Sequence, residues 1–281
     1  MKNILLPTDF SENSWNAIAY AINMYKNEVC NFYLLNVNRI SNTVVSDIPY
    51  TPYNDVIDNT LLKPSKLKLK KFTERIRTEF PINKKHKFYT LIDYNYFIDS
   101  IRKHVEEKDI DLIIMGTKGA SGLKKLLIGS NAGEVITKVS CSALIVPENA
   151  TYSPIKEIAF PTDFILSYNT NVLHSIVNIL KKETAAALRI LHIAQKGASL
   201  SLDQQNNKEV LEDLFANYKH SFHSLSNSKV EDAIQCFVES RNIDMMAMVA
   251  KNLNYFQQIL FHSKVEKISY HTNVPFLVLH E

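Results

Sequence analysis

The sequence predicts an α/β protein made of two tandem doubly wound parallel-sheet domains with Rossmann-like topology. Three observations support this prediction. Short apolar runs alternate along the chain with helical patterns, the runs lack the polar alternation of half-exposed strands, and motifs of the first half recur in the second. The length of 281 residues also suits two domains of ordinary size.

Three pairs of similar segments occur in the same order in the two halves. They are NILLPTDF (3–10) with EIAFPTDF (157–164), IDLIIMGTKG (110–119) with IDMMAMVAKN (243–252), and SALIVPE (142–148) with PFLVLHE (275–281). The first pair is offset by 154 residues and the other two by 133, so the second copy is shorter. We therefore predict domains at residues 1–149 and 152–281, joined by the turn-forming segment ENATYSPIK (148–156).

The first domain begins with a short buried strand, and Ser11 can cap the helix that starts at Glu12. This helix carries Trp15, Ile18 and Ile22 at helical spacing. The expected strands of the domain are Ile4–Leu6, Phe32–Val37, Lys87–Ile92, Leu112–Met115 and Ala143–Val146. Further helices are expected at Lys66–Phe80, Phe97–Glu107 and Asn131–Val139, and a long polar loop at Asn38–Thr60.

The second domain shows the same alternation. Its clearest strands are Ile158–Phe160, Leu188–Ile193, Met245–Val249 and Phe276–Leu279. Parallel strands separated by helices require both faces of the sheet to be covered.

Composition excludes several classes of protein. The net charge of +3 is too small to make nucleic acid a general partner. No apolar run reaches the ~18 residues of a membrane span, and MKNILLPTDF turns polar too early for a signal peptide. Three widely spaced cysteines suggest neither disulfides nor zinc, so we expect a cytoplasmic protein.

Glycine is concentrated at one place in the chain. Five of the six glycines lie between residues 116 and 133, in a segment that follows a buried strand and leads into a helix. Such a loop gathers backbone N–H groups at a helix N-terminus, where they bind phosphate. Asp9 follows the first strand at the same edge of the predicted sheet and could accept hydrogen bonds from a ribose or a base.

The spacing Gly116-x2-Gly119-x9-Gly129-Ser130, with Pro-Thr-Asp after the first strand, resembles the nucleotide-binding branch of the universal stress protein family. The resemblance covers nearly the whole chain as a tandem of two domains, of the fold also known as adenine nucleotide alpha-hydrolase-like. It implies an ATP site. The implied adenosine contacts are Pro7, Asp9, Val37 and Met115, and the implied ribose and phosphate contacts are Gly116, Gly119, Gly129 and Ser130.

Two residues near this motif carry less information. Asn131 stands where family binders commonly have an apolar residue, and Lys118 could reach a phosphate although the motif does not require it. Ser130 could cap the following helix or donate its hydroxyl to a phosphate.

The second copy lacks the glycine motif. Val249, Asn252 and His262 replace the three glycines, although Ser263 and Asp163 remain. We expect no ATP there, because side chains fill the space that a backbone would use to approach phosphate. By resemblance to family members that pair through their last strands, 142–146 and 275–279 would join the halves as an intramolecular pseudo-dimer.

The sequence leaves the finer function open. It favours a regulatory stress-response protein that binds ATP, with ADP or AMP and a magnesium ion as open alternatives, and with an unknown protein partner. A nucleotide-free dimeric scaffold is a second hypothesis. A slow ATP hydrolase that uses Asp9 or a metal-bound water is a third, although no general base or nucleophile accompanies Asp9. A homodimer of the whole chain also stays open.

Other signals have simple structural interpretations. His220 and His223 at i, i+3 spacing could clasp a metal on a helix, but solvent-facing histidines are the better interpretation. Cys141 and Cys236 lie in apolar contexts typical of packed thiols. The lysine-rich stretch 63–87 is typical of a solvated helix face.

Overall fold

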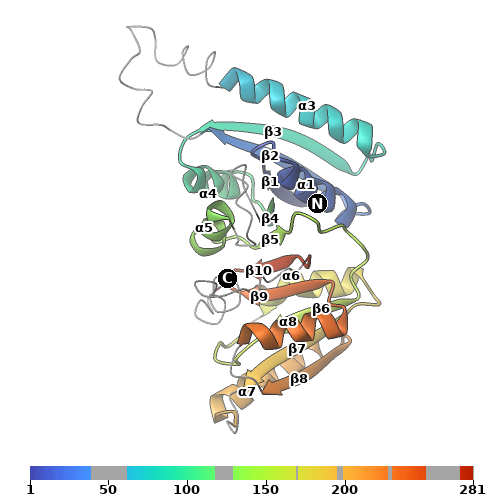
Figure 1. Ribbon diagram of the computed structural model, residues 1–281, viewed down its shortest axis with the longest axis vertical. Coiled ribbons are helices and arrows are strands. Elements are labelled where there is room, and N and C mark those ends of the chain that lie inside the picture. The colour runs from blue at the N-terminus through green and yellow to red at the C-terminus, as the bar shows by residue number, and fades with distance from the viewer. Residues whose placement is uncertain are drawn as a thin grey trace.

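The apolar runs of the sequence form the strands of one mixed sheet that runs the length of the molecule (Figure 1). The computed structural model describes residues 1–38, 62–117, 129–168, 170–194, 199–226, 230–250 and 273–280. In these residues ten strands pair in the order β3-β2-β1-β4-β5-β10-β9-β6-β7-β8. The predicted α/β fold is therefore confirmed.

The strands of the first half are β1 (Lys2–Pro7), β2 (Cys30–Asn38), β3 (His86–Tyr94), β4 (Leu112–Gly116) and β5 (Ala143–Val146). Those of the second half are β6 (Glu157–Pro161), β7 (Ala187–Ala194), β8 (His220–Ser226), β9 (Met245–Val249) and β10 (Phe276–Leu279). Pairing is parallel within each half. The predicted strands are all present, and β8 is a strand that the sequence did not predict.

Helices cover both faces of the sheet. They are α1 (Glu12–Met24), α3 (Lys63–Glu79), α4 (Phe97–Glu107), α5 (Ser130–Lys138), α6 (Thr170–Lys182), α7 (Leu202–Phe215) and α8 (Val230–Arg241). One apolar cluster packs α1, α3, α6 and α7 on one face, and a second packs α4, α5 and α8 on the other. This arrangement is the doubly wound topology that the sequence predicted.

Helix bounds agree with the predictions to within one residue except at α3, where the start differs by three. This helix begins at Lys63 rather than Lys66 because Pro64 lies in its first turn, where a missing N–H costs nothing. The predicted cap of α1 is present, since the Ser11 side chain accepts a hydrogen bond from the Ser14 backbone N–H at 3.2 Å. The predicted loop after Asn38 lies outside the described residues.

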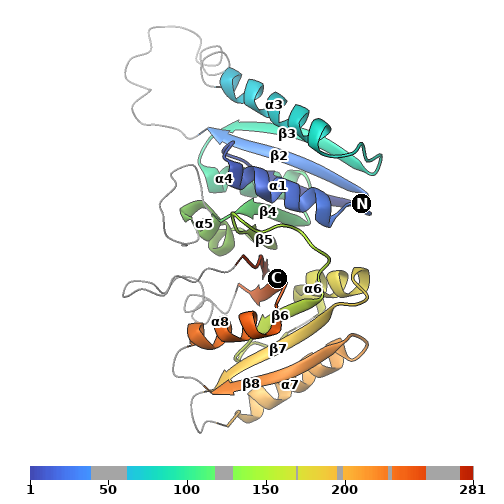
Figure 2. The same ribbon diagram turned by 45° about the vertical axis from the view of Figure 1, so that its right-hand side comes forward.

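The two halves stack along the long axis and meet at β5 and β10 (Figure 2). These strands pair antiparallel, with Phe276 opposite Ile145 and Val278 opposite Ala143. The pairing expected between 142–146 and 275–279 is thus present, and both apolar clusters run across the junction. Each strand covers an edge that would otherwise expose unpaired backbone groups.

The segment between the halves is anchored to α1. The Asn16 side-chain amide donates to the carbonyl oxygens of Pro147 and Ala150 at 3.0 and 2.9 Å. Tyr152 packs edge-on against Tyr20 with ring centroids 5.4 Å apart. The segment predicted as a joint therefore forms part of the packed structure.

Candidate functional site

The carboxyl ends of β1, β2 and β4 lie side by side at one edge of the first half. The parallel register places Pro7 beside Leu35, and Leu5 beside Ile113 of β4. Val37 packs against the apolar cluster that contains Met115, on the face covered by α4 and α5. The structure therefore brings Pro7, Val37 and Met115 to the same edge, as predicted.

Asp9 stands in the turn between β1 and α1. Its Oδ1 accepts hydrogen bonds from the Ser11 backbone N–H at 3.0 Å and from the Ser11 hydroxyl at 2.6 Å. Phe10, between them, has a φ of 66°, a left-handed conformation that the two local hydrogen bonds support. Asp9 therefore orders the entry to α1 with one oxygen, while its half-buried carboxylate stands at the predicted crevice.

A small buried polar network fixes the same turn. The Thr8 hydroxyl lies 2.9 Å from the Ser14 hydroxyl, and the Thr8 carbonyl accepts from the Asn36 side-chain amide at 2.8 Å. The sequence prediction missed Thr8 and Asn36. The signal for Thr8 was present, because the threonine of Pro-Thr-Asp recurs as Thr162 in the second half.

Gly116 ends β4 directly beneath α1. A Cβ atom at this position would lie 2.6 Å from Nδ2 of Asn13 and 2.9 Å from its Oδ1, closer than van der Waals contact allows. The absence of a side chain at Gly116 thus lets Asn13 pack against the strand. This packing role is independent of any ligand, and the predicted contact of Gly116 with a nucleotide stays a prediction.

The N-terminus of α5 lies next to the end of β4. Gly129 is the N-cap, with a φ of −59° and no side-chain capping hydrogen bond, and its N–H donates to the carbonyl of Thr117. Ser130 is the first helical residue and is exposed, so its predicted capping role is wrong. The first N–H groups of a helix have no partner within the helix, and the helix dipole adds positive potential there.

The sequence also predicted phosphate contacts from the loop between β4 and α5. Gly119 and Lys118 lie outside the described residues, so their contacts with phosphate stay predictions. Asn131 is half-buried in the first turn of α5. Within the described residues the hydroxyl oxygen of Thr117, at the start of the loop, is buried without a hydrogen-bond partner.

The second half has the same frame with a different residue at the end of the strand. β9 pairs with β10 so that Val249 lies opposite Leu279, as Gly116 lies opposite Val146 in the first half. The Val249 side chain is buried in the apolar cluster on the α6 face. Asn252, His262 and Ser263 lie outside the described residues, so their predicted effect on ATP binding stays a prediction.

The structure corrects the sequence predictions for His220 and His223 and for Cys236. His220 and His223 lie on strand β8, not on a helix, where residues three apart point to opposite faces. Burial and the nearby Arg241 and Arg189 lower the pKa of His223 below its ordinary value, which favours the neutral ring. Cys236 is exposed rather than packed because it lies on the outer face of α8, whereas Cys141 is buried as predicted.

The described residues contain neither a cluster of metal ligands nor a membrane-spanning helix. Among these residues no three histidine, cysteine or carboxylate side chains are grouped so that they could hold a metal ion. None of the helices described has both the length and the apolar character of a membrane span.

Comparison with known proteins covers both halves of the chain. Residues 1–147 match the model of the universal stress protein family. A universal stress protein of Methanocaldococcus jannaschii is 32% identical over 145 residues, which are 52% of this chain and 81% of that protein. A second, from Bacillus subtilis, is 27% identical over 148 residues, which are 51% of this chain and 97% of that protein.

The solved structures extend the likeness in fold to the second half. A universal stress protein from Archaeoglobus fulgidus superposes with a TM-score of 0.64 at 21% identity, covering 98% of this chain and 97% of its own. The family model covers the half that carries the predicted motif, and the fold spans both halves. The chain therefore belongs to the universal stress protein family.

Proposed function

We propose that the first half binds an adenine nucleotide, ATP in the first instance, at the edge formed by β1, β4 and the N-terminus of α5. The observation that carries the proposal is that β1, β2 and β4 end at one edge of the sheet, where Asp9 follows β1 and Gly129 at the start of α5 donates to the Thr117 carbonyl after β4. Ligands of open α/β sheets bind at this edge.

The chemistry of this edge suits a nucleotide. Val37 is partly exposed and offers an apolar surface to a base, with the buried Met115 in the cluster behind it, and the Asp9 carboxylate is an acceptor for ribose hydroxyls. The Ser130 N–H, in the first turn of α5, offers a donor to phosphate oxygens, and the helix dipole adds positive potential there. The glycine spacing, through its family resemblance, points to the same ligand.

We propose a regulatory rather than a catalytic role. Asp9 is the carboxylate assigned to the crevice, and it is already held by the Ser11 N–H and hydroxyl. One carboxylate in this state supplies no nucleophile with a base beside it. Occupancy by the nucleotide would instead alter a surface at this edge of the sheet that a protein partner contacts.

The two halves would act as one intramolecular pair. We propose units at residues 1–149 and 152–281 joined through β5 and β10, with nucleotide in the first unit only. Val249 supports this asymmetry because an apolar side chain packs at the strand end where the first half has Gly116 beside the polar side chain of Asn13. The free thiols of Cys30, Cys141 and Cys236 fit a stress-response protein of a reducing cytoplasm.

Calorimetric titration of the whole chain with ATP, ADP and AMP tests the proposal. Asp9→Asn keeps an oxygen that can accept from Ser11 but removes the charge, and we expect ATP affinity to fall at least tenfold. Asp163→Asn is the matched control, because Asp163 Oδ1 accepts from the Ile165 N–H at 3.1 Å in the equivalent turn. We expect this control to bind ATP normally. Absence of heat with all three nucleotides would favour the nucleotide-free scaffold.

A further inference from the structure

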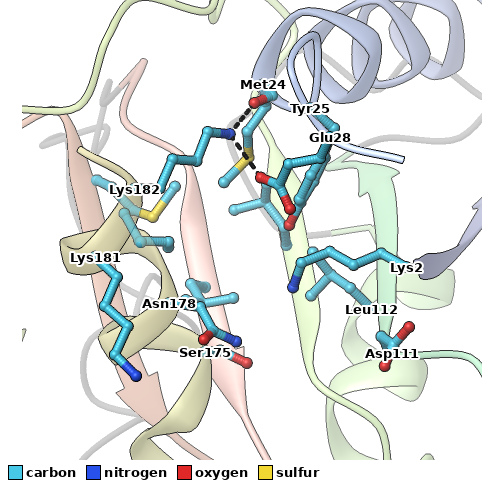
Figure 3. A pocket seen from close by; sticks show the side chains of 14 residues that line it. Lys2, Met24, Tyr25, Glu28, Asp111, Leu112, Ser175, Asn178, Lys181 and Lys182 are labelled. Atoms are coloured by element: carbon cyan, nitrogen blue, oxygen red, sulfur yellow. Dashed lines mark hydrogen bonds and ion pairs between the residues drawn. The ribbon is translucent and has the colours of Figure 1, made fainter. Parts of the chain in front are cut away.

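A cavity of about 350 Å3 lies between the halves, on the opposite edge of the sheet from the nucleotide crevice (Figure 3). It is bounded by the amino ends of β1, β4 and β9, by the C-terminal part of α1 and by α6. Its volume falls in the range of about 300–1,000 Å3 that is typical of small-molecule sites.

The wall of the cavity is apolar and comes from both halves. Its apolar side chains are Met24, Leu112, Leu144, Ile179, Met245 and Leu277. Three of these residues belong to each half, so the wall exists only where β5 and β10 join the two sheets. Such a wall favours an apolar group over a hydrated one.

The rim of the cavity is charged, and one of its lysines is already occupied. Lys182 forms an ion pair with Glu28 at 3.1 Å and donates to the carbonyl of Met24. Its ammonium group also lies 4.9 Å from the centre of the Tyr25 ring. The positive charge of Lys182 therefore offsets that of Glu28.

Two further lysines remain for a ligand. In the described part of the chain neither Lys2 nor Lys181 has a carboxylate within ion-pair distance, and both line the cavity. Lys2 reaches toward the centre of the cavity in Figure 3, while Lys181 is exposed at its mouth. The fifth charged residue, Asp111, accepts from the Asn3 backbone N–H at 2.7 Å through one carboxylate oxygen.

Tyr25 adds a hydrogen-bond donor. Its ring lies between Glu28 and Lys2, and its hydroxyl faces the cavity (Figure 3). Burial raises the pKa of Tyr25 far above its ordinary value, so the phenol keeps its proton. A protonated phenol beside a lysine can donate to an anionic oxygen.

We propose that this cavity binds a small carboxylic acid with an unbranched apolar tail, its carboxylate near Lys2 and its tail against the apolar wall. The excess of lysines over carboxylates on the rim favours an anion. Asp111 disfavours a ligand with several negative charges, which separates this site from one for ATP. The site is independent of the proposed nucleotide crevice.

Titration of the whole chain with octanoate tests the proposal, with octanol and acetate as probes that lack the charge or the tail. We expect octanoate to bind at least tenfold more tightly than either. In the methyl NMR spectrum of the methionines, Met24 and Met245 should shift on titration, because both line the cavity.

Variants locate the binding. Lys2→Gln should weaken octanoate binding at least tenfold, whereas Lys219→Gln, at an exposed lysine outside the cavity, should leave it unchanged. Ser175→Trp fills the cavity from the half-exposed surface of α6 and should abolish binding without altering the core.

Three results of these titrations would overturn the proposal, and competition with ATP would be a fourth. They are absence of octanoate binding, equal affinity for octanol, and unchanged binding in the folded Ser175→Trp variant. Saturating ATP should leave the octanoate affinity unchanged, and competition between the two would place octanoate in the nucleotide crevice instead.

Discussion

The two halves of the sheet have the same kind of turn after their first strand. They differ at the end of the neighbouring strand, which is Gly116 in the first half and Val249 in the second. In both halves a threonine hydroxyl accepts from the N–H of a phenylalanine at 3.0 Å, Thr8 with Phe10 and Thr162 with Phe164. Both phenylalanines are left-handed, with φ of 66° and 57°. The two halves therefore have the same turn after their first strand, although a helix follows directly only in the first half, where α1 begins at Glu12, while α6 begins at Thr170.

The neighbouring strand end shows where the halves diverge. Gly116 leaves room for Asn13 of α1, whereas Val249 fills the equivalent place with apolar atoms. The aspartate after the first strand does not distinguish the halves, because Asp163 is present in the second half and accepts from the Ile165 N–H at 3.1 Å. The glycine loop is the more specific sign.

The largest effect, on ATP affinity, should come from replacing Gly129 at the start of α5 with histidine, the residue at the matching sequence position (262) of the second half. Gly129→His should reduce ATP affinity at least 100-fold, about 2.7 kcal/mol, because a side chain would stand where phosphate meets the α5 N-terminus. Gly129 has a φ of −59°, which histidine adopts without strain, so the fold should persist.

Calorimetry with ATP measures this change, and circular dichroism checks the fold. His262→Gly, the reverse exchange in the second half, should not create a second ATP site while Val249 remains. If a folded Gly129→His variant binds ATP with unchanged affinity, the glycine motif does not explain a difference in ATP binding between the two halves.

The next largest effect is a loss of stability. Substitution by alanine should destabilise the protein at both Gly116 and Val249, in one case by adding a methyl group and in the other by removing methyl groups. Gly116→Ala should destabilise the protein by about 1–3 kcal/mol because the new methyl group meets Asn13. Val249→Ala should cost a similar amount, about 1–2 kcal/mol, because it removes buried methyl groups.

Urea denaturation measures both changes. Adding Asn13→Ala should relieve much of the cost of Gly116→Ala but leave that of Val249→Ala unchanged. A purely additive double variant of Gly116 and Asn13 would show that these two residues do not compete for the same space.

The smallest expected effect is a pH-dependent change in stability. It distinguishes Glu157 at the start of β6 from the equivalent residue Asn3 in β1. The hydrogen bonds from the Arg189 guanidinium, at 2.6 and 2.9 Å, lower the pKa of Glu157 below its ordinary value of 4.5. The carboxylate is then favoured in the folded state, so its contribution is present above about pH 4.5 and is lost as pH falls through the lowered pKa.

Glu157→Gln should therefore cost less than about 1 kcal/mol at pH 7, and this cost should shrink toward pH 3. Asn3, the equivalent residue of β1, uses its amide to donate to the Lys108 carbonyl at 2.9 Å. The cost of Asn3→Ala should not change over the same range. Denaturation curves at pH 7, 5 and 3 would expose a mistake in either expectation.

The sequence by itself determined the fold class, the repeat and the order of most elements. Apolar runs and helical spacing depend on neighbours along the chain, so they predicted β1, β4 and α4 closely. It failed at β8, where HSFHSLS shows no apolar run because this edge strand is only half-buried. The resemblance to the universal stress protein family, rather than any pattern in the chain, pointed to Pro7, Val37 and Met115, which lie at the carboxyl ends of β1, β2 and β4.

Only the tertiary structure showed which contacts individual residues make and therefore what role each has. Gly129 rather than Ser130 is the N-cap of α5, and Asp9 accepts from Ser11, and both are details of backbone geometry. Gly116 accommodates Asn13, which is a contact between segments. The cavity beneath Lys2 and Lys181 belongs to the same class. Its walls come from both halves of the chain, and residues so far apart in sequence become neighbours only when β5 and β10 pair.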